Sequence, residues 1–248
     1  MDKATVLGLL IGLGGILLGN VLEGGHISSL MQGTAFLIVT MGTFGAVMVS
    51  NRMKDLKTGF QLFKETFTDY EVDFETPISE IVEAARVAKK DTILALEPRI
   101  NSLKTEFLRP ILRNVVDSVE PALTREIFET QIEKEEERLL NAAKIWSDAG
   151  GYSPTIGIIG AVLGLIHVMG NLSDTSKLGA GIAVAFVATV YGVSFANLIF
   201  LPIASKIKKN IAIRIRQKQM ILEGALMIGG GINYQLVEQT LIAYRKTK

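Results

Sequence analysis

The chain has 248 residues, a formal net charge of +1 and a positive mean hydropathy of +0.35. It contains no cysteine, which excludes disulfide and thiol chemistry, and its two histidines leave little for a zinc site. The length would suit one or two globular domains, but 24 glycines and several long apolar runs indicate an integral membrane protein.

Two apolar stretches lie near the N-terminus. The first, about residues 4–22, carries pairs of glycines four residues apart, which are Gly8 with Gly12 and Gly15 with Gly19. That spacing lets membrane helices approach closely. A cleaved signal peptide is the competing interpretation, but its apolar core would be only about 7–15 residues long. The second stretch, about residues 31–50, contains no charge. We therefore predict two retained transmembrane helices.

Two further apolar stretches, about residues 153–172 and 178–203, are long enough to cross a hydrocarbon layer of about 30 Å. Neither contains Asp, Glu, Lys or Arg. Both carry small residues three or four apart, which are Gly157, Gly160 and Gly164 on the first and Gly181, Ala185, Ala188, Gly192 and Ala196 on the second. We predict that these two helices pack closely against other helices in the membrane.

Lys and Arg gather directly after the second and the fourth stretch. They are Arg52, Lys54 and Lys57 after the second, and Lys206, Lys208, Lys209, Arg214, Arg216 and Lys218 after the fourth. Such an excess marks the cytoplasmic side of a membrane, so both termini and residues 51–152 are predicted to be inside. The basic stretch after the fourth span is interpreted as a solvated anchor, and binding of anionic head groups is the alternative.

Residues 51–152 are predicted to form a helical cytoplasmic domain. Apolar residues from Met53 to Phe67 recur every three or four positions, which indicates an amphipathic helix continuous with the second span. Thr76 with Pro77 predicts the start of a helix that reaches about Lys90. Asp91 is a candidate cap for a short helix that Pro98 would interrupt.

The remaining segments are also predicted to be helical. A stripe of Leu103, Phe107, Ile111 and Val115 surrounds Pro110, and a long helix runs from about Leu123 to Trp146. Residues 204–248 are a cytoplasmic tail with helices at about 207–228 and 234–244, separated by a turn at 229–231. The fold class is therefore all-α, a polytopic membrane protein with four transmembrane helices and a helical insertion between helices two and three.

No motif in the chain indicates catalysis. The glycines around 179–181 lie in an apolar helix without a preceding strand, and the triplet at 229–231 lacks the G-K-[ST] ending of a phosphate loop. The acidic run at 133–138 is interpreted as a solvated helix face. We expect no enzymatic activity, no cofactor and no metal site.

Polar residues within the spans are few. His167 is predicted to lie mid-span, where an ionisable group is a functional candidate, although a neutral imidazole also satisfies helix–helix hydrogen bonds. The hydroxyls of Thr155 and Thr189 either bond a carbonyl of their own helix or line a polar path. No span contains a carboxylate. Because cation pathways generally need a charged or titratable group, a partner must supply it if the chain conducts ions.

Motifs along essentially the whole chain match one known family. They are M-D-x-A-T-V-L-G-L at the start, S-P-T-I-G-I-I-G-A-V-L-G-L in the third span, A-V-A-F-V-A-T-V-Y-G and L-I-F-L-P-I-A-S-K in and after the fourth, and I-L-E-G-A-L-M-I-x-G-G-I-N-Y in the tail. The chain thereby resembles the MotA/PomA A subunits of the bacterial flagellar stator, within the MotA/TolQ/ExbB proton channel family. TolQ and ExbB have one helix before the large cytoplasmic segment, whereas two are predicted here.

The resemblance implies an assembly and a function. It implies a homopentamer of A subunits around a dimer of MotB/PomB-like B subunits, whose transmembrane aspartate carries the ion, in the bacterial cytoplasmic (inner) membrane. Ion flow would produce torque on the flagellar rotor switch protein (FliG). Membrane lipid is an expected partner and nucleic acid is not. The alternative is a TolQ/ExbB-like subunit of a proton-driven complex that energises the cell envelope.

The resemblance also implies roles for particular residues. Pro154 and Pro202 look like the family's paired prolines and are expected to be hinges that couple ion passage to motion. The rotor-facing charges of the family fall on Lys89, Lys90 and Glu97. Lys89 replaces the usual arginine, and a proline directly after Glu97 is a departure from the family pattern.

The coupling ion is also predicted from the resemblance. Sodium-driven members carry a threonine where this chain has Ala161, whereas Thr189 matches a family threonine of the fourth span. A hydroxyl oxygen helps to replace the hydration shell of sodium, which a proton does not need. We therefore expect Ala161, Thr189 and Thr155 to face the partner helix along the ion pathway, with H+ as the transported ion and Na+ as the alternative.

Overall fold

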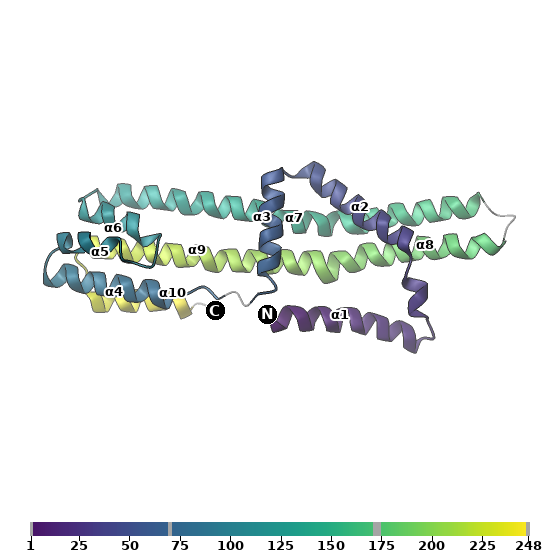
Figure 1. Ribbon diagram of the computed structural model, residues 1–248, viewed down its shortest axis with the longest axis horizontal. Helices are drawn as coiled ribbons and strands as arrows, with labels where there is room; N and C mark the ends of the chain where they lie inside the picture. The colour runs from purple at the N-terminus through teal and green to yellow at the C-terminus, as the bar shows by residue number, and fades with distance from the viewer. Residues whose placement is uncertain (1, 69–70, 171–174, 247–248) are drawn as a thin grey trace. The chain divides into compact units, whose positions relative to one another are not determined.

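The computed structural model describes residues 2–68, 71–170 and 175–246, and every regular element in these ranges is a helix (Figure 1). Four of the helices are long and apolar enough to cross a membrane. The all-α, four-span prediction is therefore confirmed. Residues Met1–Tyr70 and Leu139–Lys209 form one compact unit, which we call the spanning unit, and residues Glu71–Arg138 and Asn210–Lys248 form a second, the polar unit.

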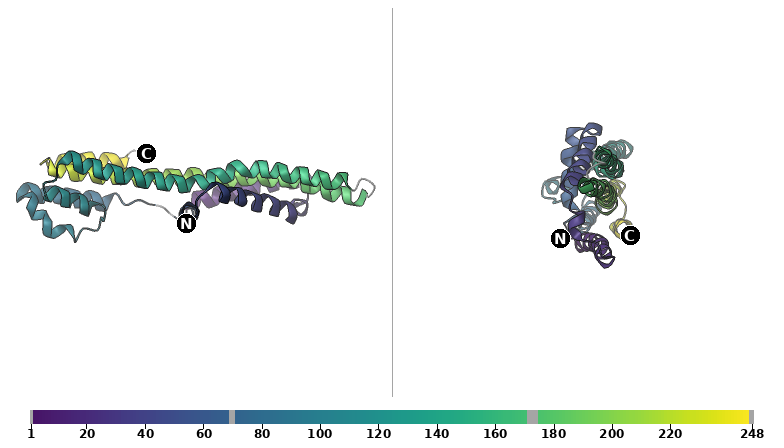
Figure 2. Two further views of the ribbon diagram at one scale, coloured as in Figure 1. Left: turned by 90° about the horizontal axis from the view of Figure 1, so that it is seen from above. Right: turned by 90° about the vertical axis from the view of Figure 1, so that its right-hand side faces the viewer.

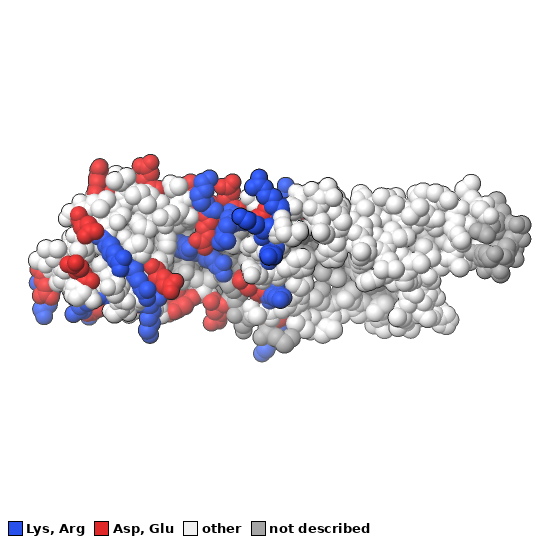
Figure 3. All heavy atoms as spheres, turned by 45° about the horizontal axis from the view of Figure 1, so that its top comes forward, with Lys and Arg blue, Asp and Glu red and all other residues white. Residues whose placement is uncertain are grey.

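The spanning unit contains all four apolar helices. Its elements are α1 (Lys3–Leu22), a 3-10 turn (Ile27–Leu30), α2 (Gly33–Ser50), α3 (Met53–Glu65), the end of α7 (Pro121–Met169), α8 (Thr175–Ser194), a π-helix (Phe195–Phe200) and the start of α9 (Leu201–Gly229). The end of α7 and α8 run side by side in both orientations (Figures 1 and 2). On the face seen in Figure 3, the described residues in the right-hand part of the molecule, where α8 and the far end of α7 lie, show no charged side chain.

Helix α2 packs against α8 and α1 lies more openly. Ala35 and Val39 of α2 form a buried cluster with Val187 and Ala188 of α8. No residue of α1 is buried. Its first turn is nevertheless held, because Asp2 caps it and forms an ion pair with Lys206 of α9. The exposed apolar surface of α1 is consistent with contact to lipid or to other helices.

The predicted continuity of α2 with the following amphipathic helix is wrong. Asn51 has an extended backbone (φ −128°, ψ 154°), and α3 starts only at Met53 and runs across the direction of α7 (Figure 1). The Asn51 Nδ2 donates to the Val47 carbonyl at 3.0 Å, so the side chain occupies an acceptor at the end of α2. The apolar periodicity predicts each of the two helices, but it does not predict the break between them at Asn51.

Helix α3 is fixed to α7 by its inner face. Gly59 lies against Ala142 and Ile145, and the indole Nε1 of Trp146 donates to the Gly59 carbonyl at 2.9 Å in a buried hydrogen bond. The indole also stacks on Phe63, with ring centroids 4.6 Å apart. This aromatic contact and the hydrogen bond hold α3 in one position against α7.

The polar unit is built from α4 (Glu75–Lys90), a 3-10 turn (Ile93–Leu96), α5 (Glu97–Ile100), α6 (Leu108–Val116), the first part of α7, the rest of α9 and α10 (Tyr234–Lys246). Its fully buried side chains include Ile81, Leu96, Leu108, Ile111, Leu112, Met220, Ile221, Leu222 and Leu241. Charged side chains crowd its surface (Figure 3). Ion pairs such as Arg125–Glu223, at 2.9 Å, join α7 to α9 within the unit.

Three local predictions in the polar unit need correction. Asp73, and not Thr76, caps α4, because its Oδ1 accepts from the Glu75 and Thr76 backbone N–H groups at 3.0 and 3.1 Å. Hydrogen bonds from the Thr76 side chain and backbone lower the pKa of Asp73. Asp91 ends α4 instead of starting a helix. Pro98 stands in the first turn of α5, where a missing N–H has no cost, so it starts this short helix and does not interrupt one.

The long helices are also longer than predicted. Helix α7 runs without a break from Pro121 to Met169, so the expected end near Trp146 is wrong. The stripe from Leu103 is only partly helical, since α6 begins at Leu108. The tail prediction is confirmed, because α9 ends at Gly229, Gly231 takes a positive φ of 67°, and α10 begins at Tyr234.

Candidate functional site

The contact between the end of α7 and α8 is made by glycine and alanine. A Cβ atom built on Gly157 would lie 2.8 Å from the Ala188 carbonyl oxygen, and one on Gly164 would lie 2.8 Å from the Ala185 nitrogen. One on Gly192 would lie 2.6 Å from the Ser153 carbonyl oxygen. The two backbones are therefore close enough that these positions admit no side chain, which confirms the packing predicted from the spacing of small residues.

Pro154 lies inside α7 and not at its start. The helix begins far upstream at Pro121, so a cap-and-first-turn role for Ser153 and Pro154 is excluded. A proline inside a helix leaves the carbonyl four residues earlier, here that of Gly150, without its usual donor. Pro154 also packs closely on α8, since a Cβ atom on Gly192 would be 3.2 Å from its Cα.

Pro202 follows a π-helical segment. Phe195–Phe200 form the π-helix, and the Leu201 backbone N–H donates to the Ala196 carbonyl, five residues earlier. Proline at 202 cannot donate, which leaves the carbonyl of Leu198 without its α-helical partner. π-Helical turns inside α-helices are frequent at functional sites. The chain nevertheless continues into α9, so Pro202 lies within one long helical path.

The segments that carry the two prolines touch each other. A Cβ atom built on Gly150, four residues before Pro154, would lie 2.5 Å from Cδ2 of Leu201, which directly precedes Pro202. This contact cannot be predicted from the sequence, because it depends on the register between two helices. The turn of α7 that lacks a backbone hydrogen bond because of Pro154 thus contacts the turn at the start of α9 that lacks one because of Pro202.

The predicted ion-pathway residues lie on these same helices. The Thr155 hydroxyl donates to the Tyr152 carbonyl at 2.8 Å, and the Thr189 hydroxyl donates to the Ala185 carbonyl at 3.3 Å. Thr155 is exposed, and Ala161 and Thr189 are half-buried. The hydroxyls are therefore bonded to their own helices, while each oxygen keeps acceptor capacity. Their orientation towards a partner helix stays a prediction.

His167 is not mid-span. It is exposed in the last turn of α7, which ends at Met169. A histidine at a helix end is a weaker indication of a proton path than one at the bilayer centre.

The three predicted rotor-facing charges lie in the polar unit, on either side of the connection between α4 and α5. Lys89 and Lys90 end α4, and Glu97 is the first residue of α5; all three are exposed. The 3-10 turn Ile93–Leu96 joins these two helices and buries Leu96. Exposed lysines and an exposed carboxylate suit a salt-sensitive contact with another protein.

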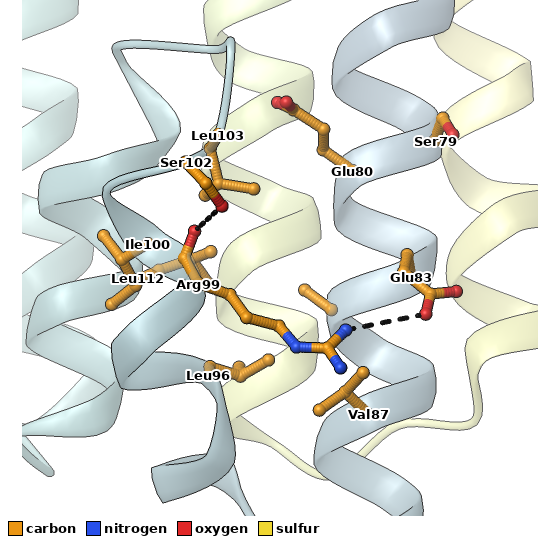
Figure 4. Close-up of a pocket in the computed structure, with 11 residues that line it drawn as sticks. Ser79, Glu80, Glu83, Val87, Leu96, Arg99, Ile100, Ser102, Leu103 and Leu112 are labelled. Atoms are coloured by element: carbon orange, nitrogen blue, oxygen red, sulfur yellow. Dashed lines mark hydrogen bonds and ion pairs between the residues drawn. The ribbon is translucent and has the colours of Figure 1, made fainter.

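A pocket of about 500 Å³ lies between α4 and the α5–α6 segment of the polar unit (Figure 4). Arg99 of α5 reaches across it towards Glu83 of α4, with 3.9 Å between Nη1 and Oε1. The Glu80 carboxylate accepts hydrogen bonds from the backbone N–H groups of Lys104 and Thr105, at 2.6 and 3.1 Å. Glu83 and Arg99 were not among the predicted site residues, although the three-residue spacing of Glu83 and Arg86 is a signal of a helical charge pair.

Comparisons with known proteins agree with the predicted family. The profile of the MotA/TolQ/ExbB proton channel family matches residues 99–220, and that of the motility protein A N-terminal region matches residues 6–82. Motility protein A of Helicobacter pylori is 33% identical over 98% of this chain and 95% of its own length. The chain belongs to the MotA/TolQ/ExbB proton channel family. Several of the relatives that match over nearly the whole chain are motility protein A subunits, and the family is one of channel subunits and not of enzymes.

Solved structures of the family have the same fold. The structure of C. jejuni MotAB matches with a TM-score of 0.91 at 32% identity, over 98% of this chain and 96% of that chain. The structure of the flagellar MotAB stator complex from Bacillus subtilis matches with a TM-score of 0.88 at 32% identity, again over 98% and 96%. Near-complete coverage on both sides means that no large part of either fold lacks a counterpart. The chain is thus a membrane protein of the inner membrane.

Proposed function

We propose that this chain is the A subunit of a flagellar motor stator, which converts ion flow through the membrane into torque on the rotor. Its spanning unit contains four apolar spans without any carboxylate, and its polar unit supplies charges for the rotor. Near-complete coverage by the two MotAB structures is the observation that carries the proposal.

The partners follow from the same proposal. A MotB/PomB-like B subunit supplies the transmembrane aspartate, and five A subunits surround two B subunits. The exposed surface of α1 and of the ends of α7 and α8 leaves ample apolar area for neighbouring chains. Both termini and the polar unit lie in the cytoplasm, on the side marked by the basic residues that follow α2 and the fourth span.

Co-expression with a candidate B subunit tests this function. The A chain should co-purify with the B subunit and restore swimming to a strain that lacks its own A subunit. Failure of both, at normal protein levels, would refute the proposal.

The TolQ/ExbB-like alternative is less well supported. Two apolar helices, α1 and α2, precede the polar unit, and the N-terminal match belongs to motility proteins. Rescue of an envelope-energising strain, without rescue of swimming, would favour that alternative.

The proposed coupling ion is H+. Ala161 offers no hydroxyl on the third span, so the pathway has one oxygen fewer to replace the hydration shell of Na+. We expect swimming speed to be independent of external sodium and to collapse with a protonophore. Speed that rises with sodium and ignores the protonophore would identify Na+ instead. Ala161 then serves only close packing beside Gly160 and Gly164.

The charges of the polar unit are proposed to contact the rotor switch protein. Exposed ion pairs contribute about 0.2–1 kcal/mol each, so reversal of Lys89, Lys90 or Glu97 alone should weaken swimming mildly and reversal of all three strongly. Lys134→Glu with Glu137→Lys, an exposed pair 3.2 Å apart on α7, is the matched control and should swim normally. Full swimming by the triple variant, at normal protein levels, would show an ordinary solvated surface.

A further inference from the structure

A groove of about 580 Å³ opens between α2 and α3 of the spanning unit. Its walls are mostly apolar and consist of Phe44, Val47 and Met48 of α2, Met53, Leu56 and Phe60 of α3, and Ile145 of α7. Three polar side chains complete the lining, Lys57, Gln61 and Lys64 of α3. No acidic residue lines the groove, and neither lysine forms an ion pair within the described ranges.

The groove is a fixed feature of the fold. Its α3 residues Met53, Lys57, Phe60 and Lys64 are spaced by four, three and four, so they share one face of the helix. The opposite face is held by the contact of Gly59 with α7 and by the hydrogen bond from Trp146. Met53 and Phe60 are 62% and 46% exposed, which is unusual for large apolar side chains on an anchored helix.

The groove lies where the apolar helix α2 ends. Residues 33–50 cross the hydrocarbon, so their last turn, with Met48, reaches the level of the lipid head groups. Helix α3 turns at Asn51 and runs across the direction of the spans (Figure 1). An amphipathic helix with apolar and lysine side chains in this orientation lies along a membrane surface.

We infer that this groove binds an anionic phospholipid of the cytoplasmic leaflet. One acyl chain lies against Met48, Met53 and Phe60, and the phosphate lies between Lys57 and Lys64. Lipid is the occupant because acyl chains already surround α2 and because the only charges in the groove are positive. A second copy of this chain would have to bring its own carboxylate to the two lysines.

The single tryptophan of the chain provides a direct readout. Trp146 packs against Phe60, with ring centroids 5.4 Å apart, and directly follows Ile145 in the groove. The full-length chain is reconstituted in vesicles of one fixed mixture of phosphatidylglycerol and phosphatidylcholine. A small share of either lipid carries bromine on its acyl chains. Bromine quenches tryptophan fluorescence at short range and needs no direct contact, so a brominated chain against Phe60 is within reach of the buried indole. The two preparations differ only in which lipid carries the bromine.

Brominated phosphatidylglycerol should quench Trp146 at a lower mole fraction than brominated phosphatidylcholine. One lysine near an anionic lipid surface should give about a five-fold preference for phosphatidylglycerol over phosphatidylcholine. Salt screens part of this attraction, so two lysines together should give roughly ten-fold. Lys57→Gln with Lys64→Gln should remove the preference. Lys54→Gln is the matched control, because Lys54 is exposed on α3 outside the groove, and it should keep the preference. An unchanged emission maximum shows that α3 still covers Trp146 in each variant.

Three outcomes would overturn the inference. Equal quenching by both lipids in the unmodified chain would show a groove without head-group selectivity. A preference that survives in the double variant would place the lipid elsewhere. Absence of quenching, together with a crosslink from Met53→Cys to another copy, would show that the groove is an interface between subunits.

Discussion

Replacing Gly192 by alanine is expected to separate α8 from α7 and to abolish motor function. The new Cβ atom would lie 2.6 Å from the Ser153 carbonyl oxygen, 3.1 Å from the Gly157 Cα and 3.2 Å from the Pro154 Cα. All three are backbone atoms and cannot rotate away, so the helices themselves must move. Overpacking of this kind costs about 1–3 kcal/mol or more.

The direction of the change in thermal stability distinguishes overpacking from helix propensity. Alanine favours a helix over glycine by about 1 kcal/mol, so helix propensity alone would predict a more stable protein. Thermal unfolding in detergent should instead show a lower midpoint, and swimming should stop. Gly14→Ala is the control, because a Cβ atom there would meet nothing within 4 Å, and its midpoint should stay equal or rise. A Gly192→Ala chain with unchanged midpoint and normal swimming would disprove the close contact.

Replacing Pro202 by alanine is expected to leave expression and assembly intact while torque falls to a small fraction. Alanine restores a backbone N–H, so the α-helix can run through the π-helical turn Phe195–Phe200. The compliant turn that faces Gly150 would then become rigid. The fourth span and α9 could then no longer bend relative to each other at this point, so ion passage would not change the angle between them.

Stall torque and speed under load measure this effect. Pro110→Ala is the matched control, because Pro110 lies in the first turn of α6, where proline is tolerated, and its motors should behave normally. If Pro202→Ala motors turn at normal speed under load, Pro202 is only a kink and the hinge proposal is wrong.

The spans were predictable from sequence because charge-free length and basic flanks are local properties. All four apolar helices follow from them, and the turn at Gly231 follows from the three successive glycines at 229–231. The corner at Asn51 and the unbroken α7 were missed for a different reason. A helix continues through Gly150 and Pro154 when a neighbouring helix packs there, and Asn51 ends α2 through a bond to Val47. Both depend on contacts that periodicity does not contain.

In the candidate site, too, the local sequence pattern was predictable and the contacts between helices were not. The small-residue pattern identified Gly157, Gly164 and Gly192 as contact points, and the structure places all three against backbone. The contact of Gly150 with Leu201 needs the register of two helices, which no single stretch of sequence specifies. The pair Glu83–Arg99 similarly joins α4 to α5 across a turn that sequence reasoning placed incorrectly.

Ion flux through reconstituted liposomes tests the central claim, that this chain forms one part of an ion pathway whose carboxylate comes from a B subunit. The sequence of the four predicted spans contains no Asp and no Glu. Liposomes with this chain alone should show no proton flux above empty liposomes. Liposomes with the chain and its B subunit should conduct, and substitution of the B subunit's transmembrane aspartate by asparagine should stop the flux. Appreciable proton flux through this chain alone, at the same protein density, would contradict the account.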